Sequence, residues 1–359
     1  MNELLKISSI AKKTNPFYKE WIKDNLFCKP IPREIFFKNN KEILNNNTPN
    51  AFTSGSSGTP IQIYRSEELG NLNSLVDIEY VSQFPGLKQV GITFHSLDKN
   101  IDINFPTSKK FQELKKRDIN GISTMPSVME EISLYLLSNN KKLNKIKYIT
   151  LMGENVEDYQ LDIIKKAFPQ AFLYSTYSTV EVGPIGYSCP HDIHSYHLYD
   201  DKLFIEVLNE NDKACSLNEL GEITITDYYN IDTPVIRYKL GDLGKFSICS
   251  CGKKCLTDIR GKTRGFIYKL DGTRETFLDY SVMLRDIDGM MQYQVLQNDL
   301  EELEIKVKSI KDIKEEIKQK TIQYFGRLPN TFSITEVEAI EKTKSGKFIA
   351  CINKVKLNE

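Results

Sequence analysis

The most distinctive stretch of the sequence reads Thr53-Ser54-Gly55-Ser56-Ser57-Gly58-Thr59-Pro60, in which seven of eight residues are glycine, serine or threonine. Ala51-Phe52 before it and Ile61-Gln62-Ile63-Tyr64 after it favour a tight loop between two strands over a flexible linker. Glycines let the backbone approach a ligand closely, and the amide and hydroxyl groups offer donors to phosphate oxygens. No Gly-Lys-Ser/Thr follows, so this is not a Walker A loop. We predict a phosphate-binding loop, with a plain Ser/Gly hairpin loop as the alternative.

The overall composition narrows the class of protein. A chain of 359 residues is long enough for two domains and a substantial core. The 48 basic residues balance the 48 acidic ones, which argues against a nucleic-acid or membrane-surface partner. No apolar run reaches the length of about 20 residues that a membrane span needs, and the N-terminus lacks the apolar core of a signal peptide. We expect a cytoplasmic protein with no nucleic-acid partner and no membrane span.

Strand-like runs alternate with helical patterns from residue 53 to about 235. The expected strands are 90–94, 148–152, 171–174, 203–207 and 222–226, and the expected helices are 128–137 and 158–168. Such alternation predicts an α/β domain with a mostly parallel sheet and covering helices.

A second unit begins near residue 262. Residues 303–307 alternate apolar and charged side chains as a half-exposed strand does, residues 310–325 place isoleucines and Tyr324 on one helical face, and residues 332–334 indicate another strand. We therefore predict a large N-terminal α/β domain over 1–262 and a small α+β C-terminal domain over 263–359.

Four further segments follow the serine-rich loop in a fixed order. They are YSTYSTVEVG (174–183), PVIRYKLGDLG (234–244), IRGKTRG (259–265) and KTKSGKF (342–348). Each alone has an ordinary explanation. Tyr177 would be a core aromatic residue, Glu181 a carboxylate at a helix N-terminus, Arg237 and Asp242 a structural ion pair, and Lys347 a solvated lysine. Only the presence of all these segments in this order distinguishes a functional site from such ordinary explanations.

Taken together, the five segments resemble the motifs of adenylate-forming enzymes, the superfamily of acyl-CoA synthetases and related ligases, over about residues 50–350. The likeness is strongest to the phenylacetate–CoA ligase branch, and Met125-Pro126-Ser127, Gly153-Glu154 and Tyr293-Gln294-Val295 add to it. The resemblance implies a large N-terminal α/β domain and a small mobile C-terminal domain, which rotates about a hinge at the position of Arg264.

The resemblance implies ATP-dependent activation of a carboxylic acid. The carboxylate attacks the α-phosphate of ATP and gives an acyl-adenylate and pyrophosphate, after which an acceptor, CoA or a carrier-protein thiol, displaces AMP. The first step brings an anion to a polyanion, so the site must supply positive charge and donors. Alternatives are an acyl-protein synthetase, an amide-forming ligase, a nucleotide-binding regulatory protein of this fold without turnover, and a zinc-stabilised interaction module.

The resemblance also assigns the nucleotide-binding residues. The β- and γ-phosphates go to the loop residues Thr53, Ser54, Gly55, Ser56, Ser57, Gly58 and Thr59. Tyr177 packs against adenine and Ser178 belongs to the same site. Glu181 binds Mg²⁺, an ion suited to oxygen ligands and phosphates. Asp242 accepts hydrogen bonds from the ribose hydroxyls.

The remaining assignments concern catalysis and the acyl group. Lys347 bridges the substrate carboxylate and the α-phosphate, and Lys262 lies near the ribose and phosphate. With Glu181, these two lysines form the expected catalytic set. Gly153 and Glu154 border the acyl pocket.

The chain departs from the family pattern at several positions. Val180 stands where a threonine or serine is usual, Lys262 replaces an arginine, and Arg264 and Gly265 replace two acidic residues. A lysine point charge does not reproduce a planar guanidinium. The departures indicate slower adenylation, an unusual acceptor or lost ligase activity.

The cysteines form a further pattern. Cys249, Cys251 and Cys255 follow C-x-C-x3-C, and similar Cys-x-Cys-Gly sequences occur in the phenylacetate–CoA ligase branch. In a cytosolic chain such clusters suggest metal rather than disulfides. A structural tetrahedral Zn²⁺ wants a fourth ligand, for which Cys189 is the first choice and His191 or His197 the alternatives. Three reduced thiols in a turn are the other interpretation.

Overall fold

The computed structural model describes residues 2–23, 28–52, 60–73, 84–93, 100–260, 266–285, 287–338, 340 and 350–355. The chain divides into two compact units, Met1–Gly261 and Lys262–Glu359.

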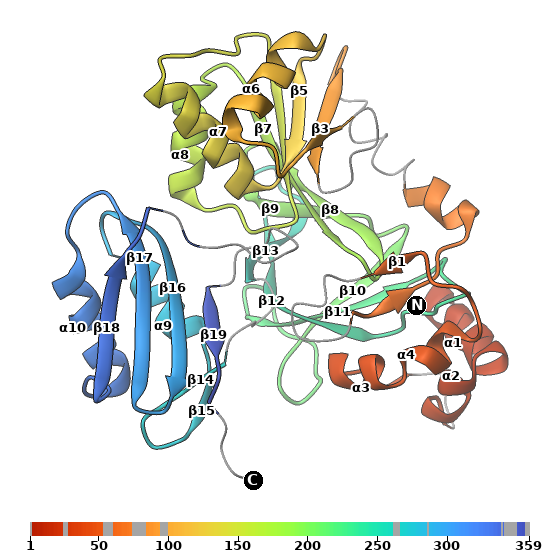
Figure 1. The fold of residues 1–359 in the computed structure, drawn as a ribbon. Coiled ribbons are helices and arrows are strands. Elements are labelled where there is room, and N and C mark those ends of the chain that lie inside the picture. The colour runs from red at the N-terminus through yellow and green to blue at the C-terminus, as the bar shows by residue number, and fades with distance from the viewer. Residues whose placement is uncertain are drawn as a thin grey trace. The chain divides into compact units, whose positions relative to one another are not determined.

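One large mixed sheet organises the first unit (Figure 1). Over the described residues its eleven strands lie in the order β10 (Leu203–Leu208), β11 (Gly221–Asp227), β12 (Tyr238–Ile248), β13 (Lys254–Arg260), β9 (Asp192–Leu198), β8 (Gly183–Cys189), β7 (Phe172–Thr179), β6 (Tyr148–Met152), β5 (Gly121–Thr124), β3 (Gln89–Thr93) and β4 (Ile101–Asp102). The α/β class is confirmed.

The expectation of a mostly parallel sheet is wrong. Across the sheet, from its β4 edge to β7, neighbouring strands run parallel. From β7 to the other edge at β10, neighbouring strands run antiparallel. The physical reason lies in the connections. Short turns join β7 to β8, β8 to β9 and β12 to β13, and a short turn allows only an antiparallel pairing, because a parallel pairing needs a long crossover.

Three helices cover the parallel half of the sheet: α6 (Thr107–Lys116), α7 (Pro126–Ser138) and α8 (Asp158–Ala167) (Figure 1). In α7 the buried side chains Val128, Met129, Ile132 and Leu136 recur at helical spacing and join the core with residues of β5 and β6. Pro126 stands in the first turn, where its missing N–H costs nothing. The helix thus begins directly after β5, as the strand-to-helix pattern predicts.

The N-terminal residues pack on the antiparallel half. They form α1 (Asn2–Thr14), α2 (Pro16–Trp21), α3 (Arg33–Lys38) and α4 (Asn40–Leu44), whose apolar side chains share a core with β10, β11 and β12. Strands β1 (Ala51–Phe52) and β2 (Gln62–Ile63) pair antiparallel, so two strands do flank the serine-rich loop. The Asn40 side chain exchanges two hydrogen bonds with the backbone of Gln62, at 2.8 and 2.7 Å, and so fixes β2 against α4.

The second unit is a small α+β structure. Its four-stranded sheet has the order β18 (Thr331–Glu336), β17 (Glu302–Ser309), β16 (Met290–Asp299), β19 (Cys351–Asn353), and β14 (Phe266–Tyr268) pairs with β15 (Arg274–Thr276). Its helices are α9 (Leu278–Arg285) and α10 (Lys314–Phe325). The predicted strand at 303–307 buries Leu303, Ile305 and Val307. Ile310, assigned to the following helix, instead lies before it and is exposed, because the chain first turns away from β17.

Among the helices that the structure describes, none has both the length and the apolar character that a bilayer crossing requires.

A buried arginine fixes the start of β12. Arg237 adopts the left-handed backbone region with φ of 45°, and only 6% of its surface is exposed. Its guanidinium donates two 2.8 Å hydrogen bonds to the Glu206 carboxylate on β10 and a 3.0 Å bond to the Cys28 carbonyl. The expected alternative of an Arg237–Asp242 ion pair is therefore wrong. The arginine instead ties β10, β12 and the N-terminal segment together.

We expect Arg237→Ala to lower the free energy of unfolding of the first unit by about 3–5 kcal/mol, because the change leaves the Glu206 carboxylate without its buried partner. Urea titration followed by the fluorescence of Trp21, the single tryptophan and a residue of this unit, measures it. The matched control is Arg117→Ala, which removes a partly exposed 3.8 Å ion pair with Glu113 and should cost less than about 1 kcal/mol. Equal losses in the two variants would contradict the structural role of Arg237.

Candidate functional site

The sequence-predicted site residues divide into two groups. Thr53, Ser54, Gly55, Ser56, Ser57, Gly58, Thr59, Lys262 and Lys347, together with the expected hinge residue Arg264, lie outside the described residues. The structure describes the others.

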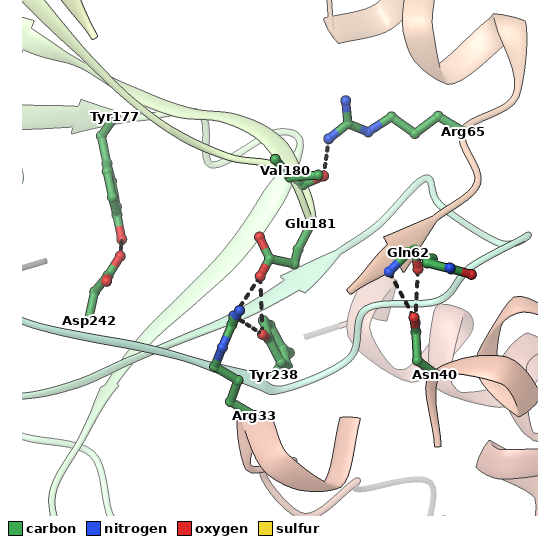
Figure 2. Close-up of polar contacts among 9 residues, drawn as sticks. All are labelled: Arg33, Asn40, Gln62, Arg65, Tyr177, Val180, Glu181, Tyr238 and Asp242. Atoms are coloured by element: carbon green, nitrogen blue, oxygen red, sulfur yellow. Dashed lines mark hydrogen bonds and ion pairs between the residues drawn. The ribbon is translucent and has the colours of Figure 1, made fainter. Parts of the chain in front are cut away.

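Tyr177 and Asp242 come from β7 and β12, two strands that are not neighbours in the sheet, yet their side chains meet (Figure 2). The Tyr177 hydroxyl donates a 2.7 Å hydrogen bond to Oδ2 of Asp242. Burial, with the nearby Asp242 carboxylate, holds the pKa of Tyr177 well above its usual value. The phenol therefore stays protonated and orients the carboxylate. Ser178, the next residue of β7, is exposed.

The backbone around Asp242 is irregular, which explains where its side chain points. Between two register positions, Thr224–Lys239 and Glu222–Leu243, β12 has two more residues than β11. Gly241 inside this bulge has φ of 76°, a conformation that favours glycine. Bulges redirect side chains and are frequent beside active sites. Asp242 lies inside this bulge, and its carboxylate meets Tyr177.

Glu181 lies in the turn between β7 and β8 and is 1% exposed. Its Oε1 accepts hydrogen bonds from the Arg33 guanidinium at 2.8 Å and from the Tyr238 hydroxyl at 3.2 Å (Figure 2). Arg33 also donates to the Tyr238 hydroxyl at 2.7 Å. The expected alternative of a helix N-terminal carboxylate is wrong, because no helix begins there. A buried carboxylate needs such partners, since burial disfavours an isolated charge.

The same contacts set the ionisation of Arg33 and Tyr238. Burial acts to lower the pKa of Arg33, but Tyr238 and Glu181 outweigh it, and the pKa lies above its ordinary value. Burial and the Glu181 carboxylate hold the pKa of Tyr238 well above its usual range. The cluster therefore consists of a charged guanidinium, a carboxylate and a neutral phenol.

Sequence reasoning missed Arg33. It stands in a segment before the motifs, and one backbone pairing brings it to the site. Ile31 forms a bridge with Tyr238, in which its N–H donates to the Arg237 carbonyl at 2.8 Å and its carbonyl accepts from the Lys239 N–H at 3.0 Å. Helix α3 then begins with Arg33. No local sequence signal announces such a long-range pairing.

The far flank of the serine-rich loop also reaches this region. Arg65, just after β2, donates a hydrogen bond to the Val180 carbonyl (Figure 2). The Tyr64 N–H donates to the Thr233 hydroxyl at 3.1 Å. The structure thus brings together the end of the loop hairpin, the turn at 180–181 and the beginning of β12.

Gly153 and Glu154 follow β6. Gly153 has φ of 81°, and the Glu154 carboxylate accepts the Ser127 N–H at 3.1 Å in the first turn of α7. A carboxylate at this place stabilises the helix N-terminus. The structure therefore gives Glu154 a structural role, and its place at the acyl pocket stays a prediction.

A second cluster contains side chains from the end of β8, from β9 and from the turn between β12 and β13. The ligand atoms of Cys189, His197, Cys249 and Cys251 all lie within 4.8 Å of one another. Nε2 of His197 is 3.2 Å from the Cys249 sulfur and 3.3 Å from the Cys251 sulfur. Burial acts to raise the pKa of the Cys249 thiol, but hydrogen bonds from Cys251, His197 and the backbone lower it to about 6. Three sulfurs and one imidazole nitrogen are ligands that tetrahedral zinc accepts.

This group differs from the expected ligand set in one residue. Cys255 packs beside Cys189 and Cys249 but lies outside the group, and its thiol donates to the Ser247 carbonyl at 3.5 Å. The register of the β12–β13 hairpin pairs Cys255 with Ser247 and so places it within the strand, beyond the turn that carries Cys249 and Cys251. His197, one of the two alternatives, completes the group with Cys189, whereas His191 is exposed and lies outside it.

Comparison with known proteins gives the following relatives. No family model matches the chain. Protein CapK of Staphylococcus aureus is 25% identical over 269 residues, which are 69% of this chain and 55% of that protein. The chain thus spans about half the length of this curated relative.

Solved structures resemble the chain more completely. A 2-hydroxyisobutyryl-CoA ligase in the postadenylation state, in complex with 2-HIB-AMP, superposes with a TM-score of 0.75 at 14% identity, over 98% of this chain and 88% of that one. The O-succinylbenzoate–CoA synthetase of Bacillus subtilis, in complex with AMP, gives 0.58 at 15% identity over 84% and 67%. An amide bond synthetase from Marinactinospora thermotolerans gives 0.59 at 14% identity over 82% and 65%. The fold that the resemblance implies is confirmed: this chain has the fold of these ligases.

Proposed function

We propose that this protein is an AMP-forming carboxylate ligase, which activates a carboxylic acid with ATP and transfers the acyl group to an acceptor. The observation that carries the proposal is the convergence of Tyr177, Glu181 and Asp242 beside the serine-rich hairpin, on a fold shared with ligases that were solved with AMP or an acyl-adenylate. Tyr177 and Glu181 lie close together at the end of β7 and in the turn after it, whereas Asp242 comes from β12, so its meeting with Tyr177 is not a consequence of sequence proximity.

In this proposal the nucleotide lies between Tyr177 and the serine-rich loop. The Asp242 carboxylate, oriented by the Tyr177 hydroxyl, accepts the ribose hydroxyls, because a desolvated carboxylate is a strong acceptor. Residues 53–59 donate to the β- and γ-phosphates, Lys262 supplies positive charge near the α-phosphate, and Lys347 draws the substrate carboxylate towards it.

Glu181 would hold Mg²⁺ together with phosphate oxygens. A carboxylate oxygen is a ligand that Mg²⁺ prefers, so the residue fits the ion by its chemistry. When bound, the ion would neutralise phosphate charge during adenylation. In the structure Oε1 of Glu181 already accepts hydrogen bonds from Arg33 and Tyr238.

The finer assignment within the superfamily rests on sequence motifs. We propose the phenylacetate–CoA ligase branch, with CoA or a carrier-protein thiol as the acceptor. An acyl-protein synthetase or an amide-forming ligase is the alternative within the fold, and one similar structure is an amide bond synthetase. The alternative from another class is a nucleotide-binding regulatory protein without turnover. The pairing of Glu181 with Arg33 and the missing hydroxyl at Val180 favour that alternative over the other non-ligase interpretations.

We also propose that Cys189, His197, Cys249 and Cys251 hold a structural Zn²⁺. Tetrahedral zinc with sulfur ligands at about 2.3 Å separates its ligand atoms by roughly 3.8 Å, and the four atoms lie within a comparable span. All seven cysteines are free thiols, which suits a reducing compartment, and we propose a cytoplasmic location.

The decisive measurement for the function is acid-dependent exchange of labelled pyrophosphate into ATP, screened over carboxylic acids. We expect exchange with at least one acid, and we expect Lys347→Ala to reduce it by at least about 100-fold while nucleotide binding stays nearly intact, because the lysine acts mainly in the transition state. Lys344→Ala, from the same segment, is the control. Nucleotide binding with no exchange for any acid would favour the regulatory alternative.

Asp242→Asn should weaken ATP binding by about tenfold or more, because hydrogen bonds to a charged group contribute about 1.5–3 kcal/mol. Tyr177→Phe removes the hydroxyl that orients this carboxylate and should produce a smaller loss. Calorimetric titration with ATP measures both, and Asp201→Asn at an exposed position is the control. ATP affinity that is unchanged in Asp242→Asn would remove the ribose assignment.

Elemental analysis of the purified protein tests the zinc proposal. We expect about one zinc per chain, its loss in His197→Ala and Cys251→Ser, and its retention in Cys255→Ala, whose thiol lies outside the group. Cys215→Ser, also outside the group, is a further control. Because structural zinc contributes to folding stability, chelation should lower the melting temperature of the wild type. Loss of zinc in Cys255→Ala with retention in His197→Ala would reverse the ligand assignment.

A further inference from the structure

We propose that Arg33 is a resident counter-ion of Glu181, so that a divalent cation competes with the guanidinium for this carboxylate. The inference deepens the proposed function and rests on it, since it assumes that nucleotide phosphates bind beside Glu181.

The burial of Glu181 makes a counter-ion necessary. Only 1% of the side chain is exposed, against 22% for Arg33, so the guanidinium is the member of the pair nearer to solvent. A ligand that approaches the carboxylate from that side meets Arg33 first. Removing the partner of a buried charge is costly, so a divalent cation that displaces Arg33 must replace a favourable interaction of the carboxylate.

The scaffold holds Arg33 in place before any ligand binds. The backbone bridge of Ile31 to Tyr238 fixes the start of α3, and the rings of Phe36 and Tyr238 pack with centroids 4.6 Å apart. The Tyr238 hydroxyl contacts both charged groups, at 2.7 Å from Arg33 and 3.2 Å from Glu181. In this cluster of three side chains, packing as well as charge fixes the position of the Arg33 guanidinium (Figure 2).

Two opposite consequences follow for ligand binding. When Arg33 is paired with Glu181, the guanidinium compensates the negative charge of the carboxylate. The carboxylate then does not repel the phosphates of a metal-free nucleotide. The same guanidinium competes with a divalent cation for the carboxylate oxygen. Removing the guanidinium should therefore weaken metal-free nucleotide binding and strengthen metal binding, whereas mere damage to the site would weaken both.

The test uses the full chain with Arg33→Gln, Arg33→Lys and Glu181→Gln, and Arg117→Gln as the matched control from another ion pair of the same unit. Affinity for α,β-methylene-ATP is measured by calorimetry in EDTA. Affinity of the nucleotide-loaded protein for Mn²⁺ is measured from the electron paramagnetic resonance signal of the free ion.

For Arg33→Gln we expect the metal-free nucleotide to bind about tenfold more weakly and Mn²⁺ about tenfold more tightly, the scale of one charge-assisted hydrogen bond. Arg33→Lys keeps the charge and should stay within about threefold of the wild type for metal-free nucleotide. Glu181→Gln should show the reverse pattern, with tighter metal-free nucleotide and weaker Mn²⁺, and it keeps the test valid if Arg33→Gln fails to fold. Arg117→Gln should change neither affinity.

Parallel losses, or no change, in Arg33→Gln and Glu181→Gln would overturn the counter-ion role while leaving the ligase proposal standing, since pyrophosphate exchange tests that proposal separately. A wild-type protein that binds no nucleotide would overturn both.

Discussion

The site depends first on a buried arginine, Arg237, which is not one of the residues expected to bind nucleotide, acid or metal. Arg237 binds Glu206 through two hydrogen bonds and the Cys28 carbonyl through a third, and so fixes the residue at which β12 begins. The next residue, Tyr238, contacts Glu181, and Asp242 follows four residues later. A shift of one residue in a strand turns every side chain to the opposite face. The ion pair at Arg237 therefore helps to set the face of Tyr238, and the bulge around Gly241 then sets the direction of Asp242.

Two carboxylates at or beside β12, Asp242 and Glu181, each accept a hydrogen bond from a neutral phenol. Tyr177 donates to Asp242, and Tyr238 donates to Glu181, and both phenols are held in the protonated form by burial and by the carboxylate itself. A tyrosine that stays neutral positions an acid without cancelling its charge. Glu181 also pairs with Arg33, at 2.8 Å. In the proposed function the two carboxylates have different partners, the ribose hydroxyls for Asp242 and a divalent cation for Glu181.

The sequence predicted those features that are encoded locally. The apolar run at 148–152 is β6, the periodic residues from 128 to 137 lie in α7, and alternation at 303–307 marks β17. The antiparallel half of the sheet was missed, because strand direction depends on how short turns connect strands rather than on the strands themselves. Arg33 shows the same limit for the site, because it reaches its cluster through a pairing between distant segments and carries no local motif. His197 was one of two alternatives, and the pairing of β9 with β13 lies beside its cluster. Cys255 fits the motif, but its thiol lies outside the group.

The two ends of β12 are held by different chemistry, and Asp242 lies between them. Arg237 fixes the beginning, and the turn after the strand carries Cys249 and Cys251 of the cysteine–histidine group. The bulge at Gly241 lies between these two anchors. A bulged strand keeps an irregular conformation only when its surroundings determine it. The metal-binding group proposed at the far end then has a consequence for nucleotide binding, since it helps to retain the irregular backbone that directs Asp242 towards Tyr177.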